Sequence, residues 1–197
     1  MSIRYHSQTV KKETLHTISV LAPHLRQGMS ILDVGCGEGY VAQELSARVG
    51  ADVHGADIVD VRRQRVGRFT LYDGQHLPFA DRQFDLILLS FVLHHVPDEG
   101  KIALLRESLR VSRGSVLVIE DTPTNALDRF FNHRHGEAYR RKIHSAAPYG
   151  FLSPCEWRWL FRGMGVEAQS RPLGRFCRSL LQPFARTAFV LQKPAVI

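Results

Sequence analysis

The stretch Ile31–Tyr40, ILDVGCGEGY, decides the fold of this chain. Its first residues are apolar or compatible with a strand, and glycine then occupies every second position, at Gly35, Gly37 and Gly39. Glycine removes the Cβ atom where a chain turns sharply from a strand into a helix, and it lets backbone N–H groups approach a ligand closely. The stretch therefore predicts a strand, a turn suited to ligand binding, and a helix.

The glycine spacing differs from the dinucleotide-binding fingerprint. GxGxxG requires glycine at the sixth position counted from Gly35, and Tyr40 stands there. A glycine loop alone is also compatible with an ordinary tight turn of an α/β domain. The residues around the loop have to distinguish a binding site from a plain turn.

Length and composition bound the class of protein. The 197 residues are 44% hydrophobic and 23% charged, which predicts one globular domain over residues 1–197. No apolar run reaches the roughly 18 residues of a membrane span, and residues 1–21 lack the apolar stretch of a signal peptide. We therefore expect a cytoplasmic protein without a transmembrane segment. Three scattered cysteines predict reduced thiols.

The formal net charge of +7 permits a nucleic-acid partner without favouring one. The basic residues are dispersed except for one local cluster, VRRQRVGR, at residues 61–68. Such a cluster is more often a solvated surface turn than a nucleic-acid contact.

Apolar residues alternate between helical and strand periods, which predicts βαβ units and a parallel sheet. The expected strands lie at 30–34, 51–56, 69–72, 84–90 and 115–120, and the expected helices at 8–25, 40–49, 99–111 and 125–142. A capping box in Ser153–Glu156 predicts another helix, which ends at Gly163. Two late strands, at 166–170 and 187–192, are expected to form an antiparallel hairpin at the sheet edge.

Two acidic residues follow the next strands along the chain. Asp57 ends the second expected strand about twenty residues after the loop, where a carboxylate can accept hydrogen bonds from both ribose hydroxyls. Asp73 follows the third expected strand and places a second acceptor at the same edge. Because ligands of open α/β sheets bind at the carboxyl ends of the strands, these sites should converge on one crevice.

Together, these motifs resemble a class I S-adenosylmethionine-dependent methyltransferase. The resemblance covers about residues 28–120 and rests on DVGCGEG at 33–39, Asp57, DGQHLPF at 73–79 and FDLILLSFVLHHVPD at 84–98. It implies an α/β, Rossmann-like seven-stranded sheet of order 3-2-1-4-5-7-6 with strand 7 antiparallel and helices on both faces. We expect residues 1–27 to form a helical cap and residues 121–164 to line or cover the acceptor pocket.

The resemblance further implies S-adenosylmethionine as cofactor and indicates where it binds. The glycine loop would lie along the methionine part, Asp57 would hold the ribose, and Asp73 would take the adenine amino group with backbone contact from Gly74. Two further residues would flank the methionine side, Ser90 and Phe91. The expected cofactor-binding residues are Asp33, Gly35, Cys36, Gly37, Gly39, Asp57, Ile58, Asp73, Gly74, Ser90 and Phe91.

No catalytic residue is assigned from the sequence. Methyl transfer from a sulfonium is an in-line displacement, so the protein mainly positions the acceptor and excludes water. If the acceptor has to lose a proton, His94 or His95 is a plausible base, with packing of the loop as the alternative role. Whether Asp121 acts as a base stays open.

A metal site is not expected. Asp121 could be grouped with His133, His135 and His144, but their spacing fits no standard ligand set, and surface histidines on a polar helix are the favoured interpretation.

The favoured function is methylation of a small-molecule acceptor. Methylation of RNA or protein is an alternative that the basic charge permits, and a non-catalytic protein that binds S-adenosylmethionine is another. An NAD-linked oxidoreductase is disfavoured because Tyr40 interrupts the fingerprint. The oligomeric state stays open.

Overall fold

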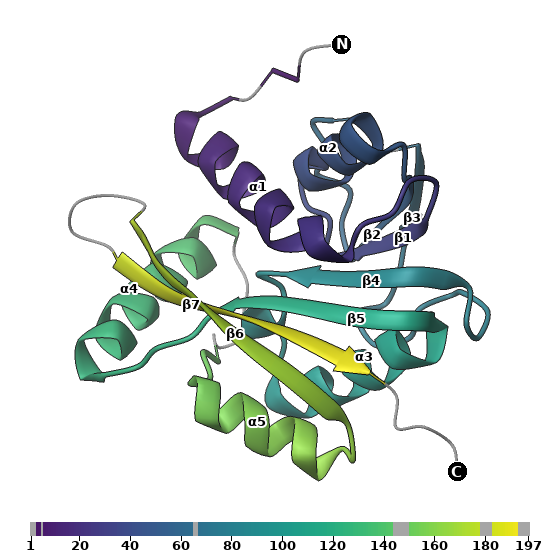
Figure 1. Ribbon diagram of the computed structural model, residues 1–197. Helices are drawn as coiled ribbons and strands as arrows, with labels where there is room; N and C mark the ends of the chain where they lie inside the picture. Colours follow the sequence, from purple (N-terminus) through teal and green to yellow (C-terminus); the bar gives the residue numbers. More distant parts are fainter. Residues whose placement is uncertain (1–2, 5, 65–66, 144–149, 178–182, 193–197) are drawn as a thin grey trace.

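The computed structural model describes residues 3–4, 6–64, 67–143, 150–177 and 183–192. Its centre is a seven-stranded sheet of order β3-β2-β1-β4-β5-β7-β6 (Figure 1). The strands are β1 Ser30–Val34, β2 Asp52–Asp57, β3 Arg68–Leu71, β4 Phe84–Ser90, β5 Ser112–Asp121, β6 Glu167–Cys177 and β7 Pro183–Gln192. β1 to β5 pair in parallel, whereas β7 is antiparallel to both β5 and β6. The predicted strand order and antiparallel last strand are confirmed.

Helices cover both faces of the sheet. In Figure 1, α1 and α2 lie on one face and α3 and α5 on the other. The helices are α1 Gln8–Leu21, α2 Tyr40–Val49, α3 Asp98–Val111, α4 Ala126–Ile143 and α5 Pro154–Gly163, with short 3₁₀ turns η1 Ala22–His24 and η2 Leu93–His95. Within the described ranges, no helix has the length and apolar composition needed to cross a membrane.

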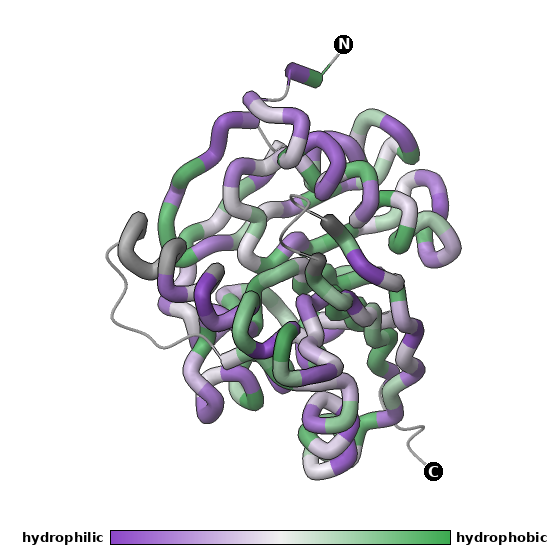
Figure 2. The backbone as a smooth tube through the Cα atoms, turned by 90° about the vertical axis from the view of Figure 1, so that its left-hand side faces the viewer, coloured by the Kyte–Doolittle hydropathy of each residue, from purple (hydrophilic) through white to green (hydrophobic). Residues whose placement is uncertain are grey.

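Alternate residues of the central strands build two apolar cores, because successive side chains of a strand point to opposite faces. On one face, Leu32 and Val34 belong to a cluster that includes Trp157 and Phe161 of α5. On the other face, Ile31 clusters with residues of α1 and α2. Figure 2 shows hydrophobic and hydrophilic residues alternating along the chain. This alternation is expected for helices that bury one side against the sheet and expose the other. This two-sided burial explains the continuous apolar runs of β4 and β5.

The first helix is shorter than predicted. It ends at Leu21 rather than near residue 25, and the chain continues as the 3₁₀ turn η1, which contains Pro23. Proline lacks the N–H group that would extend the ladder of helical hydrogen bonds. The predicted capping box is present at α5, where Ser153 Oγ accepts from the Glu156 N–H at 3.3 Å and Glu156 Oε2 accepts from the Ser153 N–H at 2.7 Å.

The last two strands are longer than predicted. Ranges 166–170 and 187–192 were expected, but β6 continues to Cys177 and β7 begins at Pro183. A register shift lies between Pro172 and Arg175, where Gly174 has φ of 75°. An edge strand can contain proline and charged residues, because one of its sides has no neighbouring strand to pair with, and proline also occurs where a bulge interrupts the pairing. Because this segment contains several polar residues and a proline, the sequence pattern did not indicate that it continues the strand.

We predict that Leu32→Ala in β1 lowers the free energy of unfolding by about 2–5 kcal/mol, because Leu32 is fully buried and the truncation leaves a cavity. The matched control is Leu71→Ala in β3, since Leu71 is 58% exposed and should change stability by less than about 0.5 kcal/mol. Urea unfolding followed by circular dichroism measures both variants. Equal losses would contradict the assignment of Leu32 to the core.

Candidate functional site

The glycine loop after β1 folds back onto the end of β2. The N–H groups of Gly35 and Cys36 donate to the carbonyl oxygen of Ala56 at 2.7 and 3.2 Å. Gly35 has φ of 70°, and a Cβ atom built on it would lie 2.4 Å from Cγ2 of Val92. Glycine is therefore required at this position both for backbone conformation and for space.

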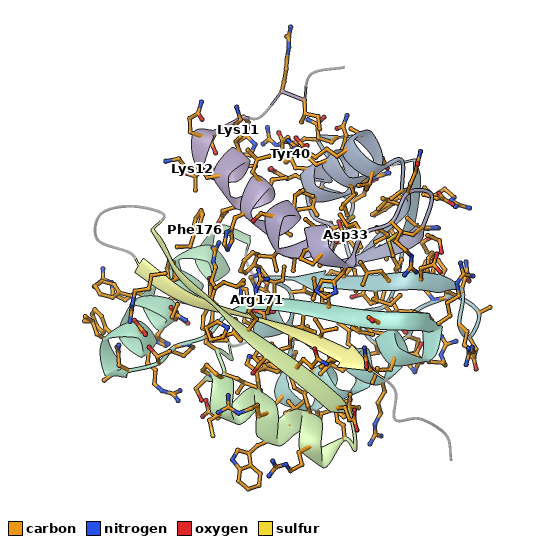
Figure 3. All side chains as sticks on the ribbon, viewed as in Figure 1. Lys11, Lys12, Asp33, Tyr40, Arg171 and Phe176 are labelled. Atoms are coloured by element: carbon orange, nitrogen blue, oxygen red, sulfur yellow. The ribbon has the colours of Figure 1, made fainter. Side chains whose placement is uncertain are left out.

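The loop ends at Gly39, which has φ of 81° and precedes the first residue of α2. That residue, Tyr40, is buried, and its hydroxyl lies 3.3 Å from Nδ1 of His6. Figure 3 shows Tyr40 between α1 and α2. The side chain that interrupts the dinucleotide fingerprint thus fills space between these two helices.

Asp57 ties the end of β2 to the glycine loop. Its Oδ2 accepts a hydrogen bond from the Gly37 N–H and its Oδ1 accepts one from the Ile58 N–H, both at 2.8 Å. The Asp57 side chain is only partly buried, while Ile58 is 64% exposed. Sequence reasoning placed Asp57 and the loop on one crevice, and the structure brings them into direct contact.

Asp73 organises the turn after β3. It accepts hydrogen bonds from the N–H groups of Gln75 and His76, and its Oδ2 lies 3.0 Å from His76 Nδ1. The hydrogen bonds from the backbone and ring of His76 lower the pKa of Asp73 to about 2. A Cβ atom on Gly74 would lie 3.4 Å from Cγ2 of Ile58, so this turn abuts the residue that follows Asp57.

Asp33 is a buried carboxyl group in the wall of a small cavity. It is 3% exposed, and its Oδ2 has no hydrogen-bond partner in the part of the chain that the structure describes. Burial, with a smaller contribution from Asp57, raises the pKa of Asp33 to about 7. The cavity measures about 130 Å³ and is lined by Val10, Glu13, Thr14, Thr17, Asp33, Gly35, Cys36, Val41, Ser90 and Phe91.

This cavity joins five of the predicted cofactor residues with α1, namely Asp33, Gly35, Cys36, Ser90 and Phe91. Gly37, Gly39, Asp57, Ile58, Asp73 and Gly74 do not line it. They continue along the carboxyl ends of β1, β2 and β3. The predicted residues thus form an extended site whose inner end is the cavity.

Phe91 follows β4 in an unusual backbone conformation. Its φ of 58° lies in the left-handed region that residues other than glycine rarely adopt, and its N–H donates to the Ile119 carbonyl oxygen at 2.9 Å. Such strain costs about 1–3 kcal/mol and persists where the surrounding structure enforces it. Here it directs the chain from β4 into the η2 turn beside the cavity.

Glu120 fixes the turn that carries the two candidate histidines. Its Oε1 accepts from the N–H groups of Val92 and Leu93 at 3.0 and 2.7 Å, and its Oε2 lies 2.6 Å from Nδ1 of His94. Burial raises the pKa of Glu120 to about 7. The ring of His94 also stacks on Phe151, with centroids 4.7 Å apart. His94 is therefore buried in packing and hydrogen bonding, whereas His95 is partly exposed.

Sequence reasoning missed a buried arginine at the same edge. Arg186 of β7 donates through Nε to Asp121 Oδ1 at 2.8 Å and through Nη2 to Glu13 Oε1 at 3.1 Å. Arg186 lies one residue before the predicted strand 187–192, so the sequence did not indicate that it would pair with Asp121. Because the carboxylate of Asp121 already pairs with Arg186, it is a poor candidate for the base that would deprotonate an acceptor.

Of the histidines grouped with Asp121, the structure describes only the side chain of His133. His133 is exposed on α4, the side chain of His135 lies outside the described part, and so does His144. Among the described residues, no group of three or more His, Cys, Asp or Glu side chains is arranged to hold a metal ion.

A larger cavity lies within the predicted acceptor region. It measures about 540 Å³, is separate from the glycine loop, and is lined by Pro123, Thr124, Asn125, Ala126, Arg129, Ser153, Pro154, Cys155 and Arg158. Asp128 holds the lining residue Thr124, because it accepts a hydrogen bond from the Thr124 N–H at 3.0 Å, and it also accepts one from Arg175 Nη1 of β6 at 2.6 Å.

The basic cluster at residues 61–68 is largely neutralised by neighbouring carboxylates. Arg62 pairs with Asp60 at 2.7 Å and Arg63 with Glu38 at 2.9 Å, and Arg68 pairs with Asp52. Arg65 lies outside the described residues. These ion pairs favour a solvated surface over a phosphate-binding one.

Comparisons with solved structures place the fold among methyltransferases. A methyltransferase from Haloferax volcanii, solved with the Trm112 methyltransferase activator, superimposes with a TM-score of 0.72 at 17% identity, covering 94% of this chain and 91% of that one. A SAM-dependent methyltransferase from Archaeoglobus fulgidus gives a TM-score of 0.70 at 13% identity, with 96% of each chain covered. At such identities the likeness shows the fold.

Sequence comparisons place the chain in a family. Methyltransferase GfsG of Streptomyces halstedii is 39% identical over 107 residues, which are 48% of this chain and 38% of that protein. The ubiquinone/menaquinone biosynthesis C-methyltransferase UbiE of Idiomarina loihiensis is 38% identical over 112 residues, 49% of this chain and 44% of that protein. The chain thus spans less than half the length of these two relatives. Residues 5–170 match a methyltransferase domain family. The protein belongs to this methyltransferase family.

Proposed function

We propose that the protein transfers a methyl group from S-adenosylmethionine directly to a small-molecule acceptor. The observation that carries this proposal is the cavity beside α1. It combines the glycine loop, the unsatisfied Oδ2 of Asp33 and the strained Phe91 at the carboxyl ends of β1 and β4. A buried carboxylate oxygen that accepts no hydrogen bond from the described residues is suited to a ligand that carries a cationic amino group.

The carboxyl ends of β1, β2 and β3 would contact successive parts of the cofactor, from the methionine part to the ribose and the adenine. Asp33 would hold the ammonium group of the methionine part, and Asp57 would accept hydrogen bonds from the ribose, since each of its oxygens accepts one backbone N–H and retains a lone pair. Asp73 and Gly74 would meet the adenine, with exposed Ile58 beside it.

When bound, the cofactor supplies an electrophilic methyl group on a sulfonium. The chain then has to orient the acceptor and exclude water. Residues 1–27 would act as the cap, since Val10, Thr14 and Thr17 of α1 already line the cavity. Residues 121–164 would cover the acceptor, and the 540 Å³ cavity within them supports that role.

A small-molecule acceptor is supported by two observations. The relative UbiE is by name a C-methyltransferase of ubiquinone and menaquinone biosynthesis. The described part of the basic cluster is engaged by carboxylates, so the positive net charge of the chain is not focused there for nucleic acid.

Asp57→Ala should weaken binding of S-adenosylhomocysteine by about 1–3 kcal/mol, because the ribose loses a charged hydrogen-bond acceptor. Isothermal titration calorimetry measures this loss, with NAD as a ligand that should not bind. Asp60→Ala is the matched control, since Asp60 is an exposed neighbour that pairs with Arg62. Equal affinity in wild type and Asp57→Ala would show that the ribose lies elsewhere.

Cofactor affinity should fall as pH drops below about 7. In the free protein the pKa of Asp33 is about 7, and an ammonium ligand favours the ionised form, so binding releases a proton below that pKa. The expected loss is up to about tenfold for each pH unit. Calorimetry from about pH 5.5 to 8 measures it, and Asp33→Asn should bind more weakly with a flatter pH profile. A wild-type profile as flat as that of Asp33→Asn would refute the role of Asp33.

Incubation of the protein with a metabolite extract and cofactor labelled in its methyl group should yield a labelled small molecule. Mass spectrometry detects the product by the added methyl group, and heat-inactivated protein is the control. Label found only in RNA or protein would favour the macromolecular alternative. Binding of the cofactor without any labelled product would favour a non-catalytic role.

A further inference from the structure

The larger of the two cavities has the size of a ligand-binding site. Its volume is about 540 Å³, and pockets for small molecules measure roughly 300–1,000 Å³. Residues 123–126 and Arg129 of α4 form one part of the lining, and residues 153–155 and Arg158 of α5 form the other. The chemistry of these residues indicates what kind of group the cavity can hold.

The charged side chains of the lining are positive. Among the described residues that line the cavity, both charged ones are arginines. Arg158 is exposed and makes no hydrogen bond or ion pair with any described residue. Arg129 is 53% exposed and donates through Nη2 to Glu156 Oε2 at 3.1 Å. Its Nε and Nη1 stay available as donors, since no other described group accepts from them.

Two carboxylates lie next to the cavity without lining it, and both are already engaged. The side chain of Asp128 is 2% exposed and pairs with Arg175 of β6 at 2.6 Å. Glu156 accepts from the Ser153 N–H at 2.7 Å as well as from Arg129. These described carboxylates therefore compensate one lining arginine in part and leave the other without a counter-charge.

The polar side chains of Asn125 and Ser153 add hydrogen-bond donors to the lining. Oδ1 of Asn125 accepts the Asp128 N–H at 2.8 Å, so its NH₂ group is the end left for another molecule. Oγ of Ser153 accepts the Glu156 N–H at 3.3 Å, and its hydroxyl hydrogen stays available. Donors beside guanidinium groups suit a group rich in acceptor oxygens, which is a carboxylate or a phosphate.

The two cavities are connected through a short segment of chain at the end of β5. Phe91, which lines the smaller cavity, donates its N–H to the Ile119 carbonyl oxygen at 2.9 Å. Pro123, which lines the larger cavity, follows Ile119 by four residues. Four residues span at most about 14 Å even when fully extended. A molecule of ordinary metabolite size that binds in the larger cavity can therefore extend toward the smaller one.

We propose that Arg158, Arg129 and Asn125 form a subsite that binds an anionic group of the methyl acceptor, a carboxylate or a phosphate. This inference rests on the proposed function and specifies its substrate class. The guanidinium groups and the amide NH₂ bind the oxygens of the anion, and the rest of the acceptor extends toward the methyl donor. Holding the acceptor by a remote charged end orients it for in-line displacement. These three are positioning residues, because they do not touch the transferred methyl group.

Cys155 provides a reporter, because its thiol is exposed and lines the same cavity. The test follows the reaction of this thiol with dithiodipyridine, an uncharged reagent that releases a coloured product. It uses Cys177→Ser protein, in which the remaining second thiol, Cys36, is buried, and Cys155→Ser identifies the signal. Octanoate and octyl phosphate should each slow the reaction in a saturable manner. Octanamide has the same chain length without the charge and should protect about tenfold more weakly.

Two variants of α5 assign the effect. Arg158→Gln should raise the concentration of octanoate or octyl phosphate that gives half-protection about tenfold, because a charged hydrogen bond is lost. Arg162→Gln is the matched control, since it removes the same charge from a residue of the same helix that lies beside Trp159 and is not among the lining residues. It should leave protection unchanged, and circular dichroism checks the folding of both variants.

Three outcomes would overturn the subsite. The first is no protection by either anion, and the second is protection by octanamide at the same concentrations, which would indicate a merely apolar cavity. The third is an equal effect of Arg158→Gln and Arg162→Gln, which would indicate diffuse attraction by the positive surface. If octyl phosphate protects at lower concentration than octanoate, the group that binds is a phosphate, and the reverse order identifies a carboxylate.

Two further measurements separate this inference from the proposed function. Absence of S-adenosylhomocysteine binding to wild type would overturn the proposed function, whereas normal binding without protection of Cys155 by the anions would overturn the subsite alone. The labelled product formed from the metabolite extract should be retained by an anion exchanger at neutral pH, and Arg158→Gln should lower its yield. A product that is not retained, or a yield that Arg158→Gln leaves unchanged, would overturn the assignment of the anion to the acceptor.

Discussion

The site depends on the pinning of the turn after β1 to the end of β2. One carbonyl oxygen, that of Ala56, accepts the N–H groups of both Gly35 and Cys36, and the next residue, Asp57, accepts the N–H of Gly37. This is possible because β1 and β2 are parallel and in register, with Val34 opposite Ala56. The turn can lie this close to the segment after β4 only because Gly35 has no Cβ atom that would collide with the side chain of Val92. The glycine turn, the carboxylate of Asp57 and the segment after β4 are thereby held together.

Two consecutive carboxylates at the end of β5 anchor the remaining walls. Successive side chains of a strand point to opposite faces, so Glu120 and Asp121 serve different neighbours. Glu120 holds the turn of Val92, Leu93 and His94, while Asp121 holds Arg186 of β7. Each carboxylate is buried, and each is compensated by backbone donors or by a charge. The dipeptide thus couples the turn after β4 to the antiparallel strand β7.

Two buried groups at this edge remain only partly satisfied, the carboxylate of Asp33 and the guanidinium of Arg186. Each orphaned atom costs about 1–3 kcal/mol of stability. Their signs are opposite, and both adjoin Phe91, which is itself strained: Asp33 through the shared cavity and Arg186 through its ring. An edge that carries unsatisfied groups and backbone strain together is one organised around molecules that complete it.

The sequence by itself determined the glycine turn and most of the helices and strands, because these follow from local patterns: apolar runs, glycine spacing and capping residues. The strand order of the sheet came from the resemblance to class I methyltransferases that the motifs carry. The tertiary structure decided what lies beside them. The burial of Asp33, the packing of Tyr40 between α1 and α2, and the partnership of Asp121 with Arg186 all join residues that are distant in sequence. The last strands were predicted too short for the same reason, since Arg171 and Pro172 read as a loop until pairing with β7 makes them an edge strand. Charge compensation between distant residues leaves no local signal, so only the folded chain reveals it.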